Sequence, residues 1–497
     1  MREPALVSKS AGWLLVGRRR RAILITAVLL VGVAGLAMRY WLLHVPFGRV
    51  DSDEATTGLM ARGVIHGNFA AIVSGNNYGG TLEAYIYAPF YWLFGPNKWV
   101  FKSVVIAEWV VVGLVLSRVA TRLWGRASGA TVALIVWAGG PWTLFLSTRF
   151  FLGYPSGVMC LGGFALFCVR LAQADRIDDA TGRRLALFCG LFAGLAFWQH
   201  PLAIATVLTG MVGLWADLRR FSVRERGRLS VWIVAAGFVG TFPFVWYNVM
   251  NSFPSKTLPE LPSSTLLGRI HTMFTQLIPR GLGLRDYGGA WVFGRITILL
   301  FAAALVALWV GAARLLRSHA AIGLAGLFGP FAMALFPSLY YTTDGHYYSF
   351  IMVPVLLCIV GCLPRSMSWD VLRPVFVAGI AIVIAAATIR VGVRDFSRNL
   401  SDPDADIYQL ADGLQAAGYK YVRADYGIAY RLTFLSNNRI VAASSLPQRF
   451  AYIDNEANAS EQEAFVAMVG DAADITWPKV MNRRRFVIGA FAIYVPK

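Results

Sequence analysis

The sequence predicts an α-helical polytopic membrane protein that carries a small α+β domain at its C-terminal end. Its 497 residues are 57% hydrophobic and only 15% charged, whereas soluble domains contain about 25% charged residues. The hydrophobic residues gather in about eleven stretches close in length to the ~20 residues that cross a bilayer. This hydrophobicity excludes a disordered chain, and the five cysteines lie within apolar runs, which excludes a disulfide framework.

The predicted spans follow one another up to the C-terminal domain. Their approximate bounds are 22–43, 99–119, 128–147, 151–171, 185–200, 201–218, 230–249, 292–313, 320–341, 348–364 and 374–392. The stretch Thr81–Phe94 is either a further span or a helix on the membrane surface. The first span follows Arg18–Arg21, exceeds a signal-peptide core in length and precedes no small-residue cleavage pattern, so we expect a retained anchor.

Arginines between the spans predict the orientation in the membrane. They concentrate in alternate connections, on the same side as Arg18–Arg21: Arg122, Arg126, Arg176, Arg183, Arg184, Arg219, Arg220, Arg224, Arg226, Arg228, Arg314, Arg317, Arg365 and Arg373. Because positive loops stay in the cytoplasm, we expect a multi-pass protein of the plasma (inner) membrane with a cytoplasmic N-terminus and an extracytoplasmic C-terminal domain. The net charge of +19 then reflects orientation, and no nucleic acid is expected as a partner, since no continuous basic face is evident.

Three polar segments are predicted to face the exterior. The transmembrane module, 1–394, contains a first external loop at about 46–98 and a second at about 251–290. The third segment is the C-terminal domain, 395–497. These segments are polar enough to carry chemistry at the membrane surface.

The C-terminal domain is predicted to mix helices and strands. A helix at Asp406–Ala417 places four apolar residues on one face: Ile407, Leu410, Ala411 and Leu414. The expected strands, which are rich in β-branched and aromatic residues, are Tyr421–Asp425, Arg439–Ala443 and Phe486–Val495. Asn437-Asn438 indicates a turn, and Glu461–Val469 is expected to form a second helix.

The acidic sequence Asp51-Ser52-Asp53-Glu54 follows the first span. Carboxylates crowded near a low-dielectric boundary repel one another, which raises their pKa values and favours a proton-accepting carboxylate. Residues 55–66 are expected to form a short helix with Asp53 and Glu54 at its positive end. The alternative is purely structural, because acidic residues often cap helices.

A second motif in the first external loop combines glycines, aromatic residues and one acid. It reads Tyr78-Gly79-Gly80-Thr81-Leu82-Glu83 and precedes several further aromatic residues. Paired glycines allow a ligand to approach the backbone closely, and aromatic rings either anchor in the interface or stack on sugars. Glu83 requires a partner, because a carboxylate among so many rings is otherwise poorly solvated.

Three motifs together carry a family resemblance. The first is Asp53-Glu54-Ala55 with the stretch Tyr78–Ala84. The second is Asp344-Gly345-His346-Tyr347-Tyr348, leading to Pro354, which is similar to an Arg-Tyr motif that opens a late span. The third is Ala424-Asp425-Tyr426 with Ala429–Phe434. They cover most of the chain, which resembles the GT-C superfamily of integral-membrane glycosyltransferases, in particular the branch with protein O-mannosyltransferases and lipid A aminoarabinose transferases.

The resemblance implies sugar transfer from a polyprenyl-phosphate-linked donor to an acceptor hydroxyl at the outer face, with inversion. Asp53 matches the family's general base, which takes the proton from the acceptor, and Glu54 would orient the acceptor or the base. Because the phosphate leaves as a stable anion, the reaction needs a base and a cationic cradle rather than an acid. Membrane lipids would surround the protein, and the acceptor would be a cell-envelope lipid, polysaccharide or protein of a bacterium.

The late motif departs from the family, because His346 stands where Arg is usual. A neutral imidazole donates one hydrogen bond and not a bidentate pair, so further cations are expected to hold the phosphate. The donor-phosphate candidates are His346, Tyr347, Arg149, Arg280, Arg285 and Lys98. Interfacial snorkelling is the alternative for Arg149, and a solvated loop is the alternative for Arg280 and Arg285.

The remaining candidates would bind acceptor or sugar. They are Tyr78, Glu83, Tyr154, His200, Asp425, Tyr430 and Arg431. A satisfied structural histidine is the alternative for His200, and a buried ion pair with core aromatics is the alternative for Asp425, Tyr430 and Arg431. No spacing suggests zinc and no cofactor is expected, although oxygen ligands of Asp51 and Asp53 would suit a divalent cation.

Two other functions stay open from the sequence alone. A lipid or small-molecule transporter or flippase would need polar groups along the middle of the membrane, where Glu108 is a rare example. The structural alternative for Glu108 is a buried hydrogen bond between helices. A non-catalytic membrane scaffold would use the C-terminal domain to recruit envelope partners.

Overall fold

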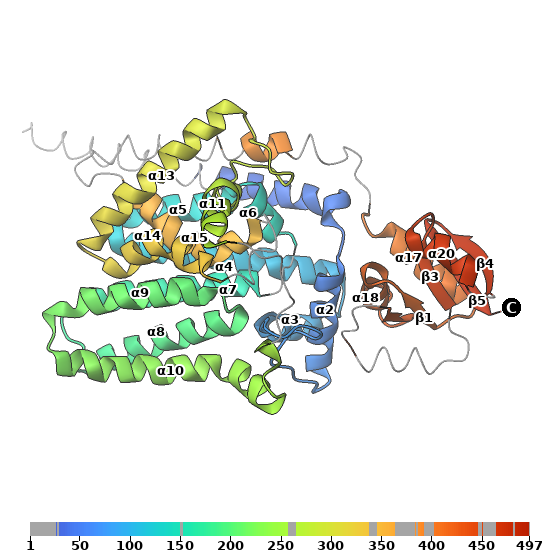
Figure 1. Ribbon diagram of the computed structural model, residues 1–497, viewed down its shortest axis with the longest axis horizontal. Helices are drawn as coiled ribbons and strands as arrows, with labels where there is room; N and C mark the ends of the chain where they lie inside the picture. Colours follow the sequence, from blue (N-terminus) through green and yellow to red (C-terminus); the bar gives the residue numbers. More distant parts are fainter. Residues whose placement is uncertain are drawn as a thin grey trace, which may run out of the picture.

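The computed structural model is mainly helical, with a small sheet near the C-terminus (Figure 1). It describes residues 29–149, 153–256, 265–336, 345–362, 386–391, 402–445, 464–480 and 483–496, and positions 26, 383 and 450. The Arg18–Arg21 cluster, Asp344 and most of the predicted span 374–392 lie outside these residues. The chain is a polytopic membrane protein with a C-terminal α+β segment, as the sequence predicts.

Within the described residues, five helices are long and apolar enough to cross a membrane. They are α4 (Lys98–Trp124), α7 (Tyr154–Ala172), α8 (Ala180–Gln199), α10 (Val223–Met250) and α13 (Arg295–Leu316). Shorter helices fall in other predicted spans: α5 (Arg126–Ala138), α9 (Ala203–Asp217), α14 (Ala320–Ala334), α15 (Ser349–Gly361) and a helical stretch at Leu29–Leu43. Short elements connect them: η1 (Pro46–Gly48), η2 (Leu218–Arg220), η3 (Pro254–Lys256), α11 (Leu266–Thr272), η4 (Met273–Leu277), α12 (Ile278–Gly281) and η6 (Gly345–Tyr348).

The predicted span 128–147 is not one helix. It breaks after α5, and α6 (Pro141–Leu146) begins two residues later. Gly139 adopts a φ of +54°, which favours glycine, and Pro141 occupies the first turn of α6, where its missing N–H costs nothing. The apolar run at 128–147 therefore contains a helix break that hydrophobicity alone does not predict.

The stretch Thr81–Phe94, for which the sequence left two alternatives, is a short helix. This stretch forms α3 (Leu82–Phe94), a helix of 13 residues, which is about 20 Å long and shorter than the ~30 Å hydrocarbon core. Its C-terminal residues Trp92, Leu93 and Phe94 are exposed. This length agrees with the membrane-surface alternative, and the choice between a surface helix and a further span stays a prediction.

The C-terminal segment is built on a five-stranded sheet with the order β2-β1-β3-β5-β4. Its strands are β1 (Tyr421–Ala424), β2 (Val441–Ser444), β3 (Ala464–Met468), β4 (Arg483–Ile488) and β5 (Phe491–Pro496), and its helices are α17 (Ala405–Ala416), α18 (Tyr426–Leu435) and α20 (Ala472–Val480). β1 pairs in parallel with β2 and β3, while β5 is antiparallel to β3 and β4. The predicted apolar face of α17 is confirmed, since Ile407, Leu410, Ala411 and Leu414 are all buried.

Two predictions in this segment are wrong. The helix expected at Glu461–Val469 is strand β3 over Ala464–Met468, where pairing with β1 and β5 on both sides overrides a weak local preference. The single strand expected at Phe486–Val495 is the hairpin of β4 and β5, which turns at Gly489 with a φ of +56°. The turn at Asn437-Asn438 is confirmed, with positive φ at both residues.

The helix α2 (Ser52–Ile65) connects the two parts of the molecule. Figure 1 shows α2 running across the ends of the long helices, with α18 and the sheet on its far side. Contact between α2 and α18 is close, because a Cβ at Gly58 would lie 2.5 Å from the Phe434 ring. The acidic motif at the start of α2 therefore lies where the C-terminal segment meets the membrane module.

Candidate active site

The acidic motif forms a capping box at the start of α2. The side chain of Asp51 accepts a hydrogen bond from the Glu54 N–H (2.8 Å), and the Glu54 carboxylate accepts one from the Asp51 N–H (3.1 Å). These bonds satisfy N–H groups that a helix leaves free at its first turn. The structural alternative thus holds for Asp51 and Glu54, but Asp53 takes no part in the box.

Glu54 is fully buried and paired with a cation from the membrane module. Its Oε1 lies 2.6 Å from the Nζ of Lys102 on α4. Burial raises the pKa of the Glu54 carboxyl, and the charge of Lys102 opposes that rise. Both side chains are buried, so Glu54 is engaged in the capping box and in the ion pair, and its expected role in orienting the acceptor or the base stays a prediction.

Asp53 is only partly buried and faces the C-terminal segment. Its Oδ1 accepts a hydrogen bond of 2.5 Å from the hydroxyl of Tyr426 at the start of α18. The neighbouring Ser52 donates its hydroxyl hydrogen to the backbone carbonyl of Tyr426. The sequence did not single out Tyr426 as a site residue, although it lies within the third motif.

Arg149 brings a cation to the same helix end. Its Nη2 lies 3.2 Å from a carboxylate oxygen of Asp51, and its guanidinium stands 5.3 Å from the centre of the Phe145 ring. The guanidinium of Arg149 does not simply extend toward bulk water, because it lies between the Asp51 carboxylate and the Phe145 ring. This ion pair therefore lies at the helix end that also carries Asp53.

Five of the predicted residues meet in a cluster of rings. Tyr154 lies at the centre, with its ring centroid 5.0 Å from His346, 6.1 Å from Tyr347 and 5.5 Å from His200, and Tyr78 lies 5.4 Å from His200. Burial and the nearby charge of His346 lower the pKa of His200 to about 3. His200 is therefore neutral at physiological pH, and it accepts a hydrogen bond from the Leu202 N–H at its Nδ1.

Glu83 lies inside the protein at the start of α3. It is 1% exposed, and its Oε1 accepts a hydrogen bond of 2.5 Å from the Ser156 hydroxyl. Burial raises the pKa of Glu83 to about 7. The partner that the sequence required for Glu83 is thus Ser156 of α7. Glu108 makes the helix contact expected for it, since its carboxylate accepts a hydrogen bond of 3.1 Å from the hydroxyl of Tyr87 on α3.

Arg280 lies in α12 and Arg285 in the loop after it, and this segment packs beside the ring cluster. A Cβ at Gly281 would overlap the ring of Tyr348 in η6, beside His346 and Tyr347. Arg285 donates to the Gln276 side chain and stacks 4.2 Å from the Trp291 ring centroid. Burial and the charge of Arg280 lower the pKa of Arg285. Two neighbouring guanidiniums create a positive potential that suits an anion.

Other predicted residues belong instead to the junction between the two parts of the molecule. Lys98, expected to contact phosphate, is buried and pairs with Asp402 and, at 3.4 Å, with Asp404. Arg431 lies 3.2 Å from Asp404 as well. Tyr430 is fully buried among aromatic rings, and Asp425 precedes α18. These contacts agree with the structural alternative for Arg431 and Tyr430 and remove Lys98 from the donor site.

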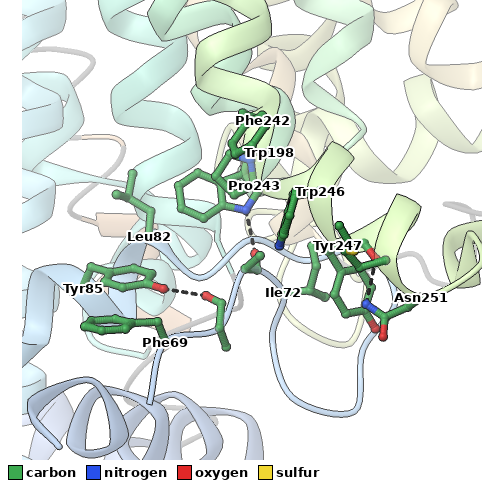
Figure 2. Close-up of a pocket in the computed structure, with 13 residues that line it drawn as sticks. Phe69, Ile72, Leu82, Tyr85, Trp198, Phe242, Pro243, Trp246, Tyr247 and Asn251 are labelled. Carbon is green, nitrogen blue, oxygen red and sulfur yellow. Dashed lines mark hydrogen bonds between the residues drawn. The ribbon is translucent and has the colours of Figure 1, made fainter. Parts of the chain in front are cut away.

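An apolar pocket of about 710 Å³ opens between the first external loop, α3, α8 and α10 (Figure 2). Aromatic side chains line it: Phe69, Tyr85, Trp198, Phe242, Trp246 and Tyr247. Trp198 and Tyr85 donate hydrogen bonds to the carbonyls of Ala71 and Ala70, which fixes the pocket wall. The pocket adjoins the ring cluster, since the Gly80 N–H bonds to the carbonyl of Gln199, between Trp198 and His200.

A metal site is not formed by the described side chains. No group of three or more His, Cys, Asp or Glu residues among them is arranged to hold an ion. Asp51, one of the two residues considered for a divalent cation, is occupied by Arg149 and the capping box.

No protein-family model matches the sequence, and no curated protein matches it. The structure nevertheless resembles the crystal structure of ArnT from Cupriavidus metallidurans in the apo state, with a TM-score of 0.61, 14% identity and 98% of each chain covered. The same protein bound to undecaprenyl phosphate gives a TM-score of 0.59 at 14% identity, over 97% of this chain and 98% of that chain.

A second solved protein has a similar fold. The Archaeoglobus fulgidus oligosaccharyltransferase tethered with an acceptor peptide gives a TM-score of 0.51 at 11% identity and covers 90% of this chain and 69% of that chain. At such identities the likeness concerns the fold. The chain therefore has the fold of ArnT from Cupriavidus metallidurans, which it shares over nearly its whole length.

Proposed function

We propose that this protein transfers a sugar from a polyprenyl-phosphate-linked donor to an acceptor hydroxyl at the outer face of the membrane, with inversion. The proposal depends on the position of Asp53 in the structure. Asp53 is a partly exposed carboxylate in the first turn of a helix, within a fold shared with transferases. A carboxylate so placed accepts the acceptor's proton while the hydroxyl oxygen attacks the sugar carbon and the phosphate leaves.

Three arginines are suited to the leaving phosphate. Arg149 stacks on Phe145, whose ring contacts Trp142, and the Trp142 ring lies 6.3 Å from that of His346. Arg280 precedes Gly281, which packs on Tyr348 beside His346 and Tyr347, and Arg285 follows in the same segment. Guanidiniums stabilise negative charge on phosphate oxygens by bidentate hydrogen bonds. We assign the donor phosphate to this region and the sugar to the ring cluster of Tyr78, Tyr154 and His200, with Glu83 behind it.

The lipid part of the donor requires an apolar surface that reaches the membrane. The aromatic pocket provides one next to the ring cluster, and the structure of ArnT with undecaprenyl phosphate supports a polyprenyl-linked donor. The orientation expected from the arginines, with a cytoplasmic N-terminus, would place this site on the outer side of an inner membrane. The acceptor is then a lipid, polysaccharide or protein of the cell envelope.

The test is Asp53→Asn, which keeps size and polarity but removes the base. Membranes containing the full chain would receive a panel of radiolabelled undecaprenyl-phosphate-linked sugars, and label entering envelope material would be counted. We expect D53N to reduce incorporation by roughly 10²- to 10⁴-fold, with insertion and thermal unfolding unchanged. Incorporation at the wild-type rate would eliminate Asp53 as the base. Mass spectrometry of co-purifying lipids would identify the natural donor.

A further inference from the structure

The C-terminal segment contributes a side chain to the proposed site. The Tyr426 hydroxyl donates a 2.5 Å hydrogen bond to Oδ1 of Asp53, although 373 positions separate the two residues. Ser52, adjacent to Asp53, donates in return to the carbonyl of Tyr426. Two hydrogen bonds thus join the first turn of α2 to the first turn of α18.

Further hydrogen bonds fasten the junction around this contact. Asp404 is fully buried and accepts hydrogen bonds from the Val50 N–H at 3.1 Å and from Arg431 at 3.2 Å. Arg62 of α2 donates to the side chain of Asn438 at 2.7 Å. These contacts lie before and after Asp53 along the chain, so α18 has little freedom to withdraw the Tyr426 hydroxyl.

We propose that Tyr426 is a positioning residue for Asp53, so that the active site is complete only when the C-terminal segment is docked. The inference rests on the proposed role of Asp53 as the base. By holding one carboxylate oxygen, the phenol directs the other oxygen toward the acceptor. It also stabilises the ionised form that accepts a proton.

The other ionisable groups near this turn have partners of their own. Asp51 pairs with Arg149, Glu54 with Lys102, and Arg431 with Asp404. On the helices packed against α2, α3 presents Tyr91 and α18 presents Tyr430, both buried phenols. Replacing Tyr426 by Phe therefore removes the hydrogen bond to Asp53 and leaves these pairs in place.

The experiment uses the full-length protein and a readout that needs no substrate. Water-soluble carbodiimide labels protonated carboxyls, and peptide mass spectrometry would give the extent of Asp53 labelling between pH 3 and 8, roughly spanning carboxyl titration. We expect Tyr426→Phe to move the labelling midpoint of Asp53 upward by about one pH unit. Tyr419→Phe, which removes a phenol from the same segment away from Asp53, is the matched control and should leave the midpoint unchanged.

Transfer from the undecaprenyl-phosphate sugars gives a second readout. Tyr426→Phe should lower kcat by roughly tenfold with little change in KM, and the acid limb of its pH profile should move upward with the labelling midpoint. An unchanged midpoint and rate would overturn the role of Tyr426, as would a slower rate accompanied only by a lower unfolding temperature. If D53N retained transfer, the proposed function would fail, whereas an inactive D53N beside a normal Y426F would defeat only this inference.

Discussion

Lys102 of α4 and Glu54 of α2 form an ion pair from which water is excluded, with 2.6 Å between Nζ and Oε1. The pair separates the functions of two adjacent acids. Glu54 is directed inward and fixes the helix end against the membrane module, while Asp53 stays partly exposed. A single peptide bond thus joins an anchoring carboxylate to the one proposed to do chemistry.

Breaking this pair should destabilise the protein. Lys102→Met leaves a buried carboxylate without its counter-charge, and we expect a loss of about 3–5 kcal/mol. The double variant Glu54→Gln with Lys102→Met should recover most of that loss, because no unpaired charge remains. Thermal unfolding in detergent would measure both. Arg439→Gln, which breaks an exposed pair with Asp412, should cost at most about 1 kcal/mol, and a K102M variant no less stable than R439Q would contradict the assignment.

Arg149 should matter for binding the donor's phosphate. Removing a charge-assisted hydrogen bond costs roughly tenfold or more in affinity, so we expect Arg149→Ala to weaken binding of undecaprenyl phosphate and Arg149→Lys to weaken it less. Native mass spectrometry with undecaprenyl phosphate would report the affinities. Arg170→Ala is the matched control. Arg170 also stacks on an aromatic ring, but it lies in the last turn of α7, whereas Arg149 precedes the first turn of that helix. Equal affinities for R149A and R170A would rule out this role.

Glu83 should make stability depend on pH. Burial raises the pKa of its carboxyl from 4.5 to about 7, so the folded state retains a proton that the unfolded chain releases between these values. Its contribution to stability is complete below about 4.5 and is lost as pH rises through about 7. Glu83→Gln should therefore unfold like the wild type at low pH and be more stable at pH 8.5, by about 3 kcal/mol. Equal stabilities of the two proteins at both pH values would show that burial does not raise the pKa of Glu83.

Local patterns predicted the helices well and the contacts between distant segments poorly. The α17 face followed from a spacing of three and four residues, and the helix after the acidic motif followed from its charged first turn. Strand β3 was missed because its stability comes from β1 and β5, which lie far away in the sequence. Likewise, nothing near Lys98 indicates that Asp404 will neutralise it.

The same distinction holds for the candidate site. Motif matching selected Asp53 and His346, but not Tyr426 or Lys102, whose roles arise from contacts across the fold. One signal for Lys102 was available, since a lysine near the start of an apolar span is costly without a partner. Tyr426 lay in a motif assigned only to the C-terminal domain, and its neighbours attracted attention because they are charged.

Docking of the C-terminal segment should depend on the absence of a side chain at Gly58. A Cβ there would lie 2.5 Å from the Phe434 ring, so Gly58→Ala should force α18 away from α2, at a cost of about 1–3 kcal/mol. Limited proteolysis and hydrogen exchange should then show faster cleavage and exchange in α18. Gly63→Ala is the matched control on the same helix, because its Cβ would approach no atom closer than 3.5 Å. Combining G58A with Phe434→Leu should restore protection, whereas equal protection in G58A and G63A would mean that this contact does not hold the two parts together.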